Sequence, residues 1–171
     1  MEISKANFSG NIFERFYGLD EVLTYSLGKS VLDVGASDGL VAYEFARYGA
    51  SHLDLIEKDE DRVAFSKRLF RDVPTKTTHV SLDILNIKLL KKELLDGYDI
   101  VLFLGVYHHL VQQTEKEKVC DLISLLIDKT KKYFVVRTPK IDEVADIIGK
   151  RLKMSLRMSH NNIGDIAIWE K

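Results

Sequence analysis

The chain has 171 residues, of which 46% are hydrophobic and 30% charged, and 25 basic against 26 acidic side chains leave a formal net charge of −1. This length fits one domain with one core, and the balanced charge excludes a global attraction to nucleic acid or to acidic membranes. The single cysteine, Cys120, excludes an internal disulfide and a zinc site built from several thiolates, and we expect no metal site.

The first 29 residues are amphipathic and rich in aromatic side chains, and we expect them to form a helical cap on the remaining domain, residues 30–171. One or two helices are predicted between residues 12 and 27. The aromatic rings either pack against the core, which we favour, or cover a binding site; they are Phe8, Phe13, Phe16, Tyr17 and Tyr25. The start of the chain lacks the apolar core of a signal peptide, and no apolar run is long enough to span a bilayer. We therefore expect a cytoplasmic protein that contacts no membrane.

From residue 30 onward, short β-branched runs alternate with longer amphipathic ones. This pattern predicts strands at 30–34, 52–57, 77–82, 98–104 and 133–136. It predicts helices between and after them at 40–48, 60–70, 86–95, 115–127 and 141–148. Two further strands, 152–158 and 163–170, are joined by so short a link that they must pair antiparallel. The fold class is therefore α/β: a doubly wound three-layer sandwich around a mostly parallel seven-stranded sheet, with an antiparallel last strand.

A glycine-containing turn follows the first strand, in the segment Val-Leu-Asp-Val-Gly-Ala-Ser-Asp-Gly-Leu at 31–40. Ligands bind at the carboxyl ends of strands in such sheets, where the strand order reverses. The dinucleotide fingerprint requires three glycines, but Ser37 and Leu40 stand at its second and third positions. Asp33 also places a negative charge where a phosphate is unfavourable. The turn therefore favours a cationic ligand over a dinucleotide.

This segment resembles motif I of class I S-adenosylmethionine-dependent methyltransferases, which runs acidic-x-Gly-x-Gly-x-Gly. Asp33, Gly35 and Gly39 match that pattern, and Ser37 replaces the middle glycine. The resemblance extends from about residue 30 to the end of the chain. It implies a Rossmann-like methyltransferase fold, S-adenosyl-L-methionine as the cofactor, and transfer of its methyl group to an acceptor.

The same resemblance implies further cofactor contacts at successive strand ends. Glu57 matches the acidic residue that holds both ribose hydroxyls. Asp83 and Ile84 match the positions that recognise the adenine amino group and cover the adenine ring. Gly105, with the residue after it, matches the backbone that lines the cofactor pocket. Each carboxylate taken singly has an ordinary alternative, which is to cap a strand end or a helix.

Residues that act on the acceptor are expected directly after the fourth strand, in a His-His-Leu turn. His108 or His109 can take a proton near neutral pH, with a slight preference for His109, and Tyr107 is expected to line the acceptor pocket. Each has the alternative of packing or orienting the turn. Arg137, in the loop after the fifth strand, either clamps a substrate carboxylate or phosphate or forms a surface salt bridge.

The sequence is compatible with three functions that differ in the methyl acceptor or lack one. Little of the chain lies outside the cofactor-binding sheet, which favours a small molecule methylated on oxygen, nitrogen or carbon. Residues 98–110 also resemble enzymes that modify a wobble-uridine hydroxyl in tRNA, so a tRNA or RNA acceptor ranks second. A catalytically silent cofactor-binding module inside a complex is the third possibility. A protein partner or a homodimer is compatible with each of them.

Overall fold

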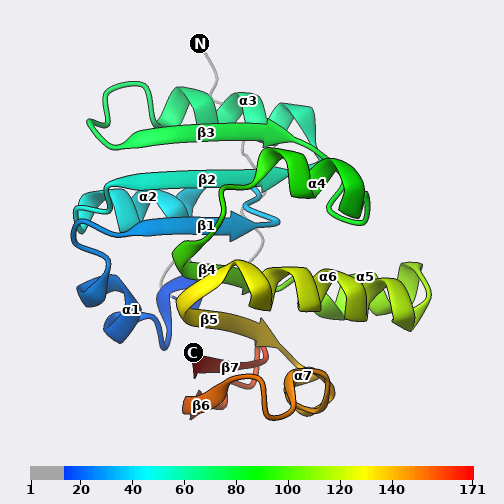
Figure 1. Cartoon of the computed structure of the whole chain (residues 1–171). Helices are drawn as coiled ribbons and strands as arrows, with labels where there is room; N and C mark the ends of the chain where they lie inside the picture. Colours follow the sequence, from blue (N-terminus) through cyan, green and yellow to red (C-terminus); the bar gives the residue numbers. More distant parts are fainter. Residues whose placement is uncertain (1–13) are drawn as a thin grey trace.

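Seven strands form one sheet in the order β3-β2-β1-β4-β5-β7-β6 in the computed structural model, which describes residues 14–171 (Figure 1). Strands β1 to β5 pair in parallel, whereas β7 runs antiparallel to both β5 and β6. The predicted sheet is therefore confirmed. The strands are β1 (Ser30–Val34), β2 (His52–Glu57), β3 (Lys76–Ser81), β4 (Tyr98–Leu104), β5 (Thr130–Thr138), β6 (Lys153–Met158) and β7 (Asp165–Glu170).

Helices cover both faces of the sheet and create two separate hydrophobic cores. One face carries the 3-10 helix η1 (Glu14–Phe16), α1 (Asp20–Tyr25), α2 (Leu40–Arg47) and α3 (Glu60–Leu69). The other face carries α4 (Ile87–Glu93), α5 (Tyr107–Gln113), α6 (Lys116–Lys129) and α7 (Ile141–Ile148). Because it is covered on both sides, the central strand β4 is apolar on both faces. No helix in the described part of the chain is both long and apolar enough to cross a membrane.

Two predicted elements differ from the structure. Strand β5 is longer at both ends than the predicted 133–136, because its polar ends also pair with β4; Arg137, for example, lies opposite Leu104. Arg137 therefore belongs to a strand and not to the loop after it. The predicted His-His-Leu turn is instead the helix α5, with Tyr107 and Leu110 buried one turn apart. A segment this short offers too few residues to reveal helical periodicity.

The N-terminal segment packs on the sheet in the part that the structure describes. Val22 and Leu23 of α1 are buried in one core. The ring of Tyr25 stands edge-on to Tyr133 of β5, with 5.0 Å between ring centroids. These contacts fit the packing role, and the division into a cap and a domain stays a prediction. Two of the aromatic residues considered above, Phe8 and Phe13, lie outside the described residues.

A buried polar cluster stabilises the opposite end of the strands from the glycine-containing turn. The Tyr98 hydroxyl donates to Asp54 Oδ2 at 2.5 Å and accepts from the Leu95 amide at 2.9 Å. We expect Tyr98→Phe to lower the free energy of unfolding by about 1–3 kcal/mol, because the buried Asp54 carboxylate and the Leu95 amide each lose a hydrogen bond. Urea denaturation measures this, with the exposed Tyr48→Phe as the control. Equal stability of the two variants would contradict the prediction.

Candidate functional site

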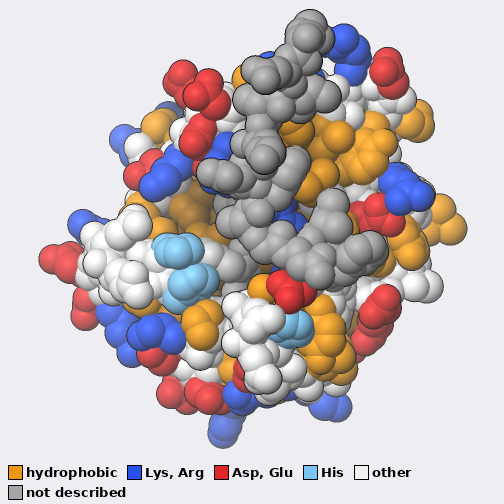
Figure 2. All heavy atoms as spheres, turned by 180° about the vertical axis from the view of Figure 1, so that it is seen from behind, with side chains coloured by type: hydrophobic (Ala, Val, Ile, Leu, Met, Phe, Trp, Pro, Cys, Tyr) orange, Lys and Arg blue, Asp and Glu red, His pale blue; other side chains and the backbone are white. Residues whose placement is uncertain are grey.

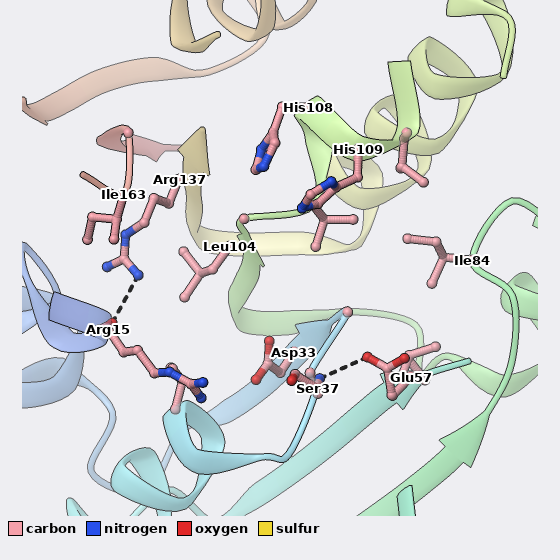
Figure 3. A pocket seen from close by; sticks show the side chains of 18 of the residues that line it. Arg15, Asp33, Ser37, Glu57, Ile84, Leu104, His108, His109, Arg137 and Ile163 are labelled. Carbon is pink, nitrogen blue, oxygen red and sulfur yellow. Dashed lines mark hydrogen bonds between the residues drawn. The ribbon is translucent and has the colours of Figure 1, made fainter. Parts of the chain in front are cut away.

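A pocket of about 830 Å³ lies at the carboxyl edge of the sheet (Figure 3). Four neighbouring strands each contribute a residue at or near their ends: Asp33 from β1, Glu57 from β2, Leu104 from β4 and Arg137 from β5. The strand order reverses here, since β2 lies on one side of β1 and β4 on the other. This is the position at which open α/β sheets bind their ligands.

The glycine-containing turn forms the floor of this pocket. Gly35 has φ +77°, and a Cβ atom at this position would lie 2.5 Å from Val106 Cγ2. Ser37 is the one non-glycine residue with a positive φ, +54°, in the described chain. Its amide donates to Glu57 Oε2 at 2.9 Å, and its hydroxyl accepts a hydrogen bond from Arg62. These contacts hold a serine in a conformation that favours glycine, so the departure from the family motif is accommodated.

Asp33 is a buried carboxylate without a partner. Its residue is only 3% exposed, and it forms no hydrogen bond or ion pair with residues 14–171. Burial raises the pKa of Asp33 to about 7, and the nearby charges of Glu57 and Asp38 add to this effect. A buried carboxylate of this kind favours a cationic ligand, because such a ligand supplies the missing charge.

Glu57 is oriented by main-chain amides. Its Oε2 accepts from Ser37 N, as described above, and its Oε1 accepts from Asp59 N at 3.0 Å. Glu57 therefore also fills the ordinary alternative role, in which a carboxylate caps the end of a strand. Each carboxylate oxygen retains a second lone pair, so Glu57 can still accept hydrogen bonds from a pair of hydroxyl groups in the pocket.

The segment after β3 and the end of β4 reach the same pocket. Asp83 and Ile84 both line it, and Asp83 Oδ1 accepts from the Leu85 amide at 2.9 Å. Gly105 has φ +74°, and a Cβ atom there would meet nothing within 4 Å. The structure thus brings these predicted residues together with Asp33 and Glu57, while their contacts with adenine and with the cofactor remain predictions.

Both histidines of α5 line the pocket. Their ring centroids lie 4.0 Å apart, and His108 is the more buried of the two. Burial lowers the pKa of His108, and neighbouring His109 adds to the effect. His108 Nδ1 is buried and has no hydrogen-bond partner within residues 14–171. A neutral imidazole at this position can accept a proton at pH 7.

Tyr107 does not reach the pocket. It is fully buried, and its hydroxyl donates to Glu143 Oε2 of α7 at 3.0 Å. Burial raises the pKa of Tyr107, and the hydrogen bond to Glu143 adds to this effect. The prediction that Tyr107 lines the acceptor pocket was wrong, because the helical geometry of α5 directs this side chain into the core.

Sequence reasoning missed the residues that close one side of the pocket. Arg15 Nη1 lies 3.0 Å from both carboxylate oxygens of Asp38 in the glycine-containing turn. The loop between β6 and β7, residues 160–164, also lines the pocket. Asn162 Nδ2 in this loop donates to Glu14 Oε1 at 3.2 Å. No sequence signal pairs segments so far apart, since only the folded sheet brings them together.

Comparison with known proteins identifies the fold. No family model matches the chain, and no curated protein matches its sequence. The N-methyltransferase NodS from Bradyrhizobium japonicum, solved with S-adenosyl-l-homocysteine, has a TM-score of 0.75 at 13% identity, covering 99% of this chain and 93% of its own. A ribosomal protein L11 methylase from Lactobacillus delbrueckii has a TM-score of 0.62 at 10% identity, with 87% and 74% covered. A candidate RNA methyltransferase from Pyrococcus horikoshii has a TM-score of 0.64 at 15% sequence identity, and the match covers 89% of this chain and 78% of that one. The chain therefore has the Rossmann-like fold of class I S-adenosylmethionine-dependent methyltransferases.

Proposed function

We propose that the chain is an S-adenosylmethionine-dependent methyltransferase that acts on a small molecule. The observation that carries this proposal is the buried carboxylate of Asp33, which no residue of 14–171 pairs with, one strand away from the oriented carboxylate of Glu57. S-adenosylmethionine carries an ammonium group, a sulfonium group and a ribose diol, and it has no phosphate. Its ammonium group supplies a positive charge for Asp33, and its ribose diol supplies hydroxyl donors for Glu57. A solved structure of the same fold, bound to S-adenosyl-l-homocysteine, supports the choice of this cofactor.

The residues of the pocket divide into cofactor-holding and acceptor-facing groups. Asp33 would attract the ammonium group, Glu57 would accept hydrogen bonds from the ribose hydroxyls, and Ile84 would cover the adenine ring beside Asp83. Gly35 lets the turn lie against the side chain of Val106, where a Cβ atom would stand 2.5 Å from Val106 Cγ2. When bound, the cofactor supplies a methyl group activated by its sulfonium sulfur. The protein then mainly aligns the acceptor and excludes water.

His108 is the residue that we assign to proton transfer. Its Nδ1 atom has no hydrogen-bond partner in the described part of the chain, and burial lowers its pKa, so the imidazole is neutral at pH 7. When the acceptor atom carries a proton, His108 can take it as the acceptor is methylated. His109, which is more exposed on the same helix, is the alternative base.

A small molecule is favoured over RNA by the distribution of charged side chains on the described surface. Two arginines of the basic stretch at 150–157 are already paired: Arg151 with Asp128 at 2.6 Å, and Arg157 with Asp142 at 2.6 Å. On the face that Figure 2 shows, basic and acidic side chains are interspersed rather than gathered by sign. Binding to the phosphates of RNA requires a basic surface. A pocket of about 830 Å³ suits a cofactor and a small acceptor.

A labelled-methyl assay tests the proposal. The protein is incubated with S-adenosylmethionine and either a cytoplasmic metabolite extract or total RNA, and a His108→Ala variant serves as the comparison. We expect transfer to the metabolite pool, reduced by about 100-fold or more in the variant if the acceptor must lose a proton. Transfer to RNA alone would overturn the small-molecule assignment. Cofactor binding without transfer to either pool would favour the silent module.

A further inference from the structure

Arg137 carries a buried positive charge that no acidic side chain of residues 14–171 neutralises. The residue is 6% exposed, and no carboxylate within residues 14–171 forms an ion pair with it. Its Nη1 donates to the carbonyl of Arg15 at 3.0 Å, and its Nη2 donates to the carbonyl of Tyr17 at 2.8 Å. Its Nε is buried and has no hydrogen-bond partner within the described residues. Contacts with residues 14–171 therefore use only two of the five guanidinium N–H bonds.

The surroundings of Arg137 offer no other compensation. Burial alone lowers the pKa of Arg137 to about 10, with no acidic neighbour to oppose it. Two other carboxylates of the pocket are already paired: Asp38 with Arg15, and Asp165 with Arg157 at 2.9 Å. An uncompensated buried cation is unfavourable, whereas a paired and hydrogen-bonded one is tolerated. No residue of 14–171 supplies the missing acidic partner, which leaves this position open to an anionic ligand.

The position of Arg137 separates it from the cofactor-holding residues. It lies near the end of β5, and β4 stands between β5 and the β1 strand of Asp33. Neighbouring strands are about 4.8 Å apart, so the two main chains lie about 10 Å from one another. Figure 3 shows Arg137 and His108 across the pocket from Asp33, Ser37 and Glu57. Arg137 therefore faces the half of the pocket that holds the proposed base.

We propose that the methyl acceptor is an anion whose carboxylate or phosphate group pairs with the guanidinium of Arg137. The inference rests on the proposed function and names its substrate class. The planar fork of arginine suits both anions, because it can present two parallel N–H groups to their oxygens. Pairing at Arg137 would leave the rest of the acceptor directed toward His108. The other source of a carboxylate is the methionyl part of the cofactor itself, and the test below separates the two.

The test uses the full chain saturated with S-adenosylhomocysteine, with isotope-labelled arginine. Acetate, inorganic phosphate and neutral acetamide are added at constant ionic strength, and the Arg137 Nε–Hε resonance and the Tm are recorded. We expect a saturable shift of this resonance and a rise in Tm with acetate or phosphate, and neither change with acetamide. In Arg137→Gln the rise in Tm should disappear, while the Kd of S-adenosylhomocysteine stays within about twofold. Arg151→Gln, an exposed arginine paired with Asp128, should behave as the wild type.

Two outcomes would overturn the inference. The absence of a saturable shift with either anion would make Arg137 a purely structural link to residues 15 and 17. A loss of S-adenosylhomocysteine affinity of about tenfold or more in Arg137→Gln would assign it to the cofactor carboxylate instead. If Arg137→Gln does not fold, Arg137→Lys keeps the charge and the wild-type resonance still decides. Failure of the wild type to bind S-adenosylhomocysteine would refute the proposed function, and the same titration of the free protein would still test the anion site.

Discussion

Replacing Asp33 with asparagine is expected to weaken S-adenosylhomocysteine binding about 10- to 100-fold at pH 8, since a charged hydrogen-bonding partner is lost. The same change should make the free protein more stable at that pH. Asp33 is 3% exposed and has no cationic partner within residues 14–171. An amide of equal size removes this buried, uncompensated charge from the free protein. Calorimetric titration and thermal denaturation measure the two effects.

The pH dependence of this stability effect has a definite sign. Asp33 has an unfolded pKa of 3.8 and a folded pKa of about 7. Its contribution to stability is therefore fully present below about pH 4 and is lost as the pH rises toward 7. Asp33→Asn should stabilise the free protein at pH 8 by a few kcal/mol at most, on the order that such a pKa difference permits, and not at pH 4.

Asp99→Asn is the matched control for this experiment. Asp99 lies on β4 at the opposite end of the sheet, where its Oδ2 accepts from Ser30 N at 2.9 Å and Ser30 Oγ at 2.8 Å. Loss of its charge should lower stability and leave ligand affinity unchanged. Our account of Asp33 would be contradicted if Asp33→Asn kept wild-type affinity, or if it destabilised the free protein at pH 8.

Gly35→Ala is expected to lower both stability and cofactor affinity. The φ of +77° at this position is strained for alanine, and the added Cβ would stand 2.5 Å from Val106 Cγ2. We expect a loss of about 2–4 kcal/mol in the free energy of unfolding, which combines left-handed strain with overpacking. Displacement of Val106 would also narrow the pocket, so the Kd of S-adenosylhomocysteine should rise. Urea denaturation and calorimetry measure the two losses.

Gly28→Ala separates strain from contact in this prediction. Gly28 has φ +71°, but a Cβ atom there would meet nothing within 4 Å. The Gly28→Ala variant should therefore lose only about 1–2 kcal/mol of the free energy of unfolding, which is the strain component, and should bind S-adenosylhomocysteine as the wild type does. Adding Val106→Ala to Gly35→Ala should recover part of the difference. Equal losses in the two single variants, with unchanged affinity in both, would show that Val106 does not form the wall of the pocket.

The sequence predicted the elements whose burial is nearly uniform. Strand β4, which is apolar on both faces, was predicted with its exact bounds, because a covered parallel strand has a distinctive composition. The ends of β5 and the helix α5 were missed. The β5 ends are polar and are held by pairing with β4, and seven residues of α5 show too little periodicity. The hydrophobic pattern of a segment predicts its bounds poorly where pairing or packing with distant residues sets them.

The candidate site follows the same division. Asp33 and Glu57 were expected from the glycine-containing turn and from the resemblance to methyltransferases, and they lie at one edge because parallel strands bring their carboxyl ends together. The burial of Tyr107 and the pairing of Arg15 with Asp38 depend on helix direction and on contacts between distant segments. Arg137 was singled out as a candidate, but only the structure shows that its charge is buried and has no acidic partner among residues 14–171.

Calorimetric titration of the full chain with S-adenosylmethionine at pH 8 tests the central claim most directly. Wild-type protein should bind one equivalent, and Glu57→Ala should bind about 10- to 100-fold more weakly, because the ribose hydroxyls lose a charged acceptor. Glu44→Ala on α2, whose carboxylate pairs with Arg47, is the matched control and should bind as the wild type does. Absence of saturable binding to the wild type, or equal affinity in Glu57→Ala, would contradict the assignment of this pocket to the cofactor.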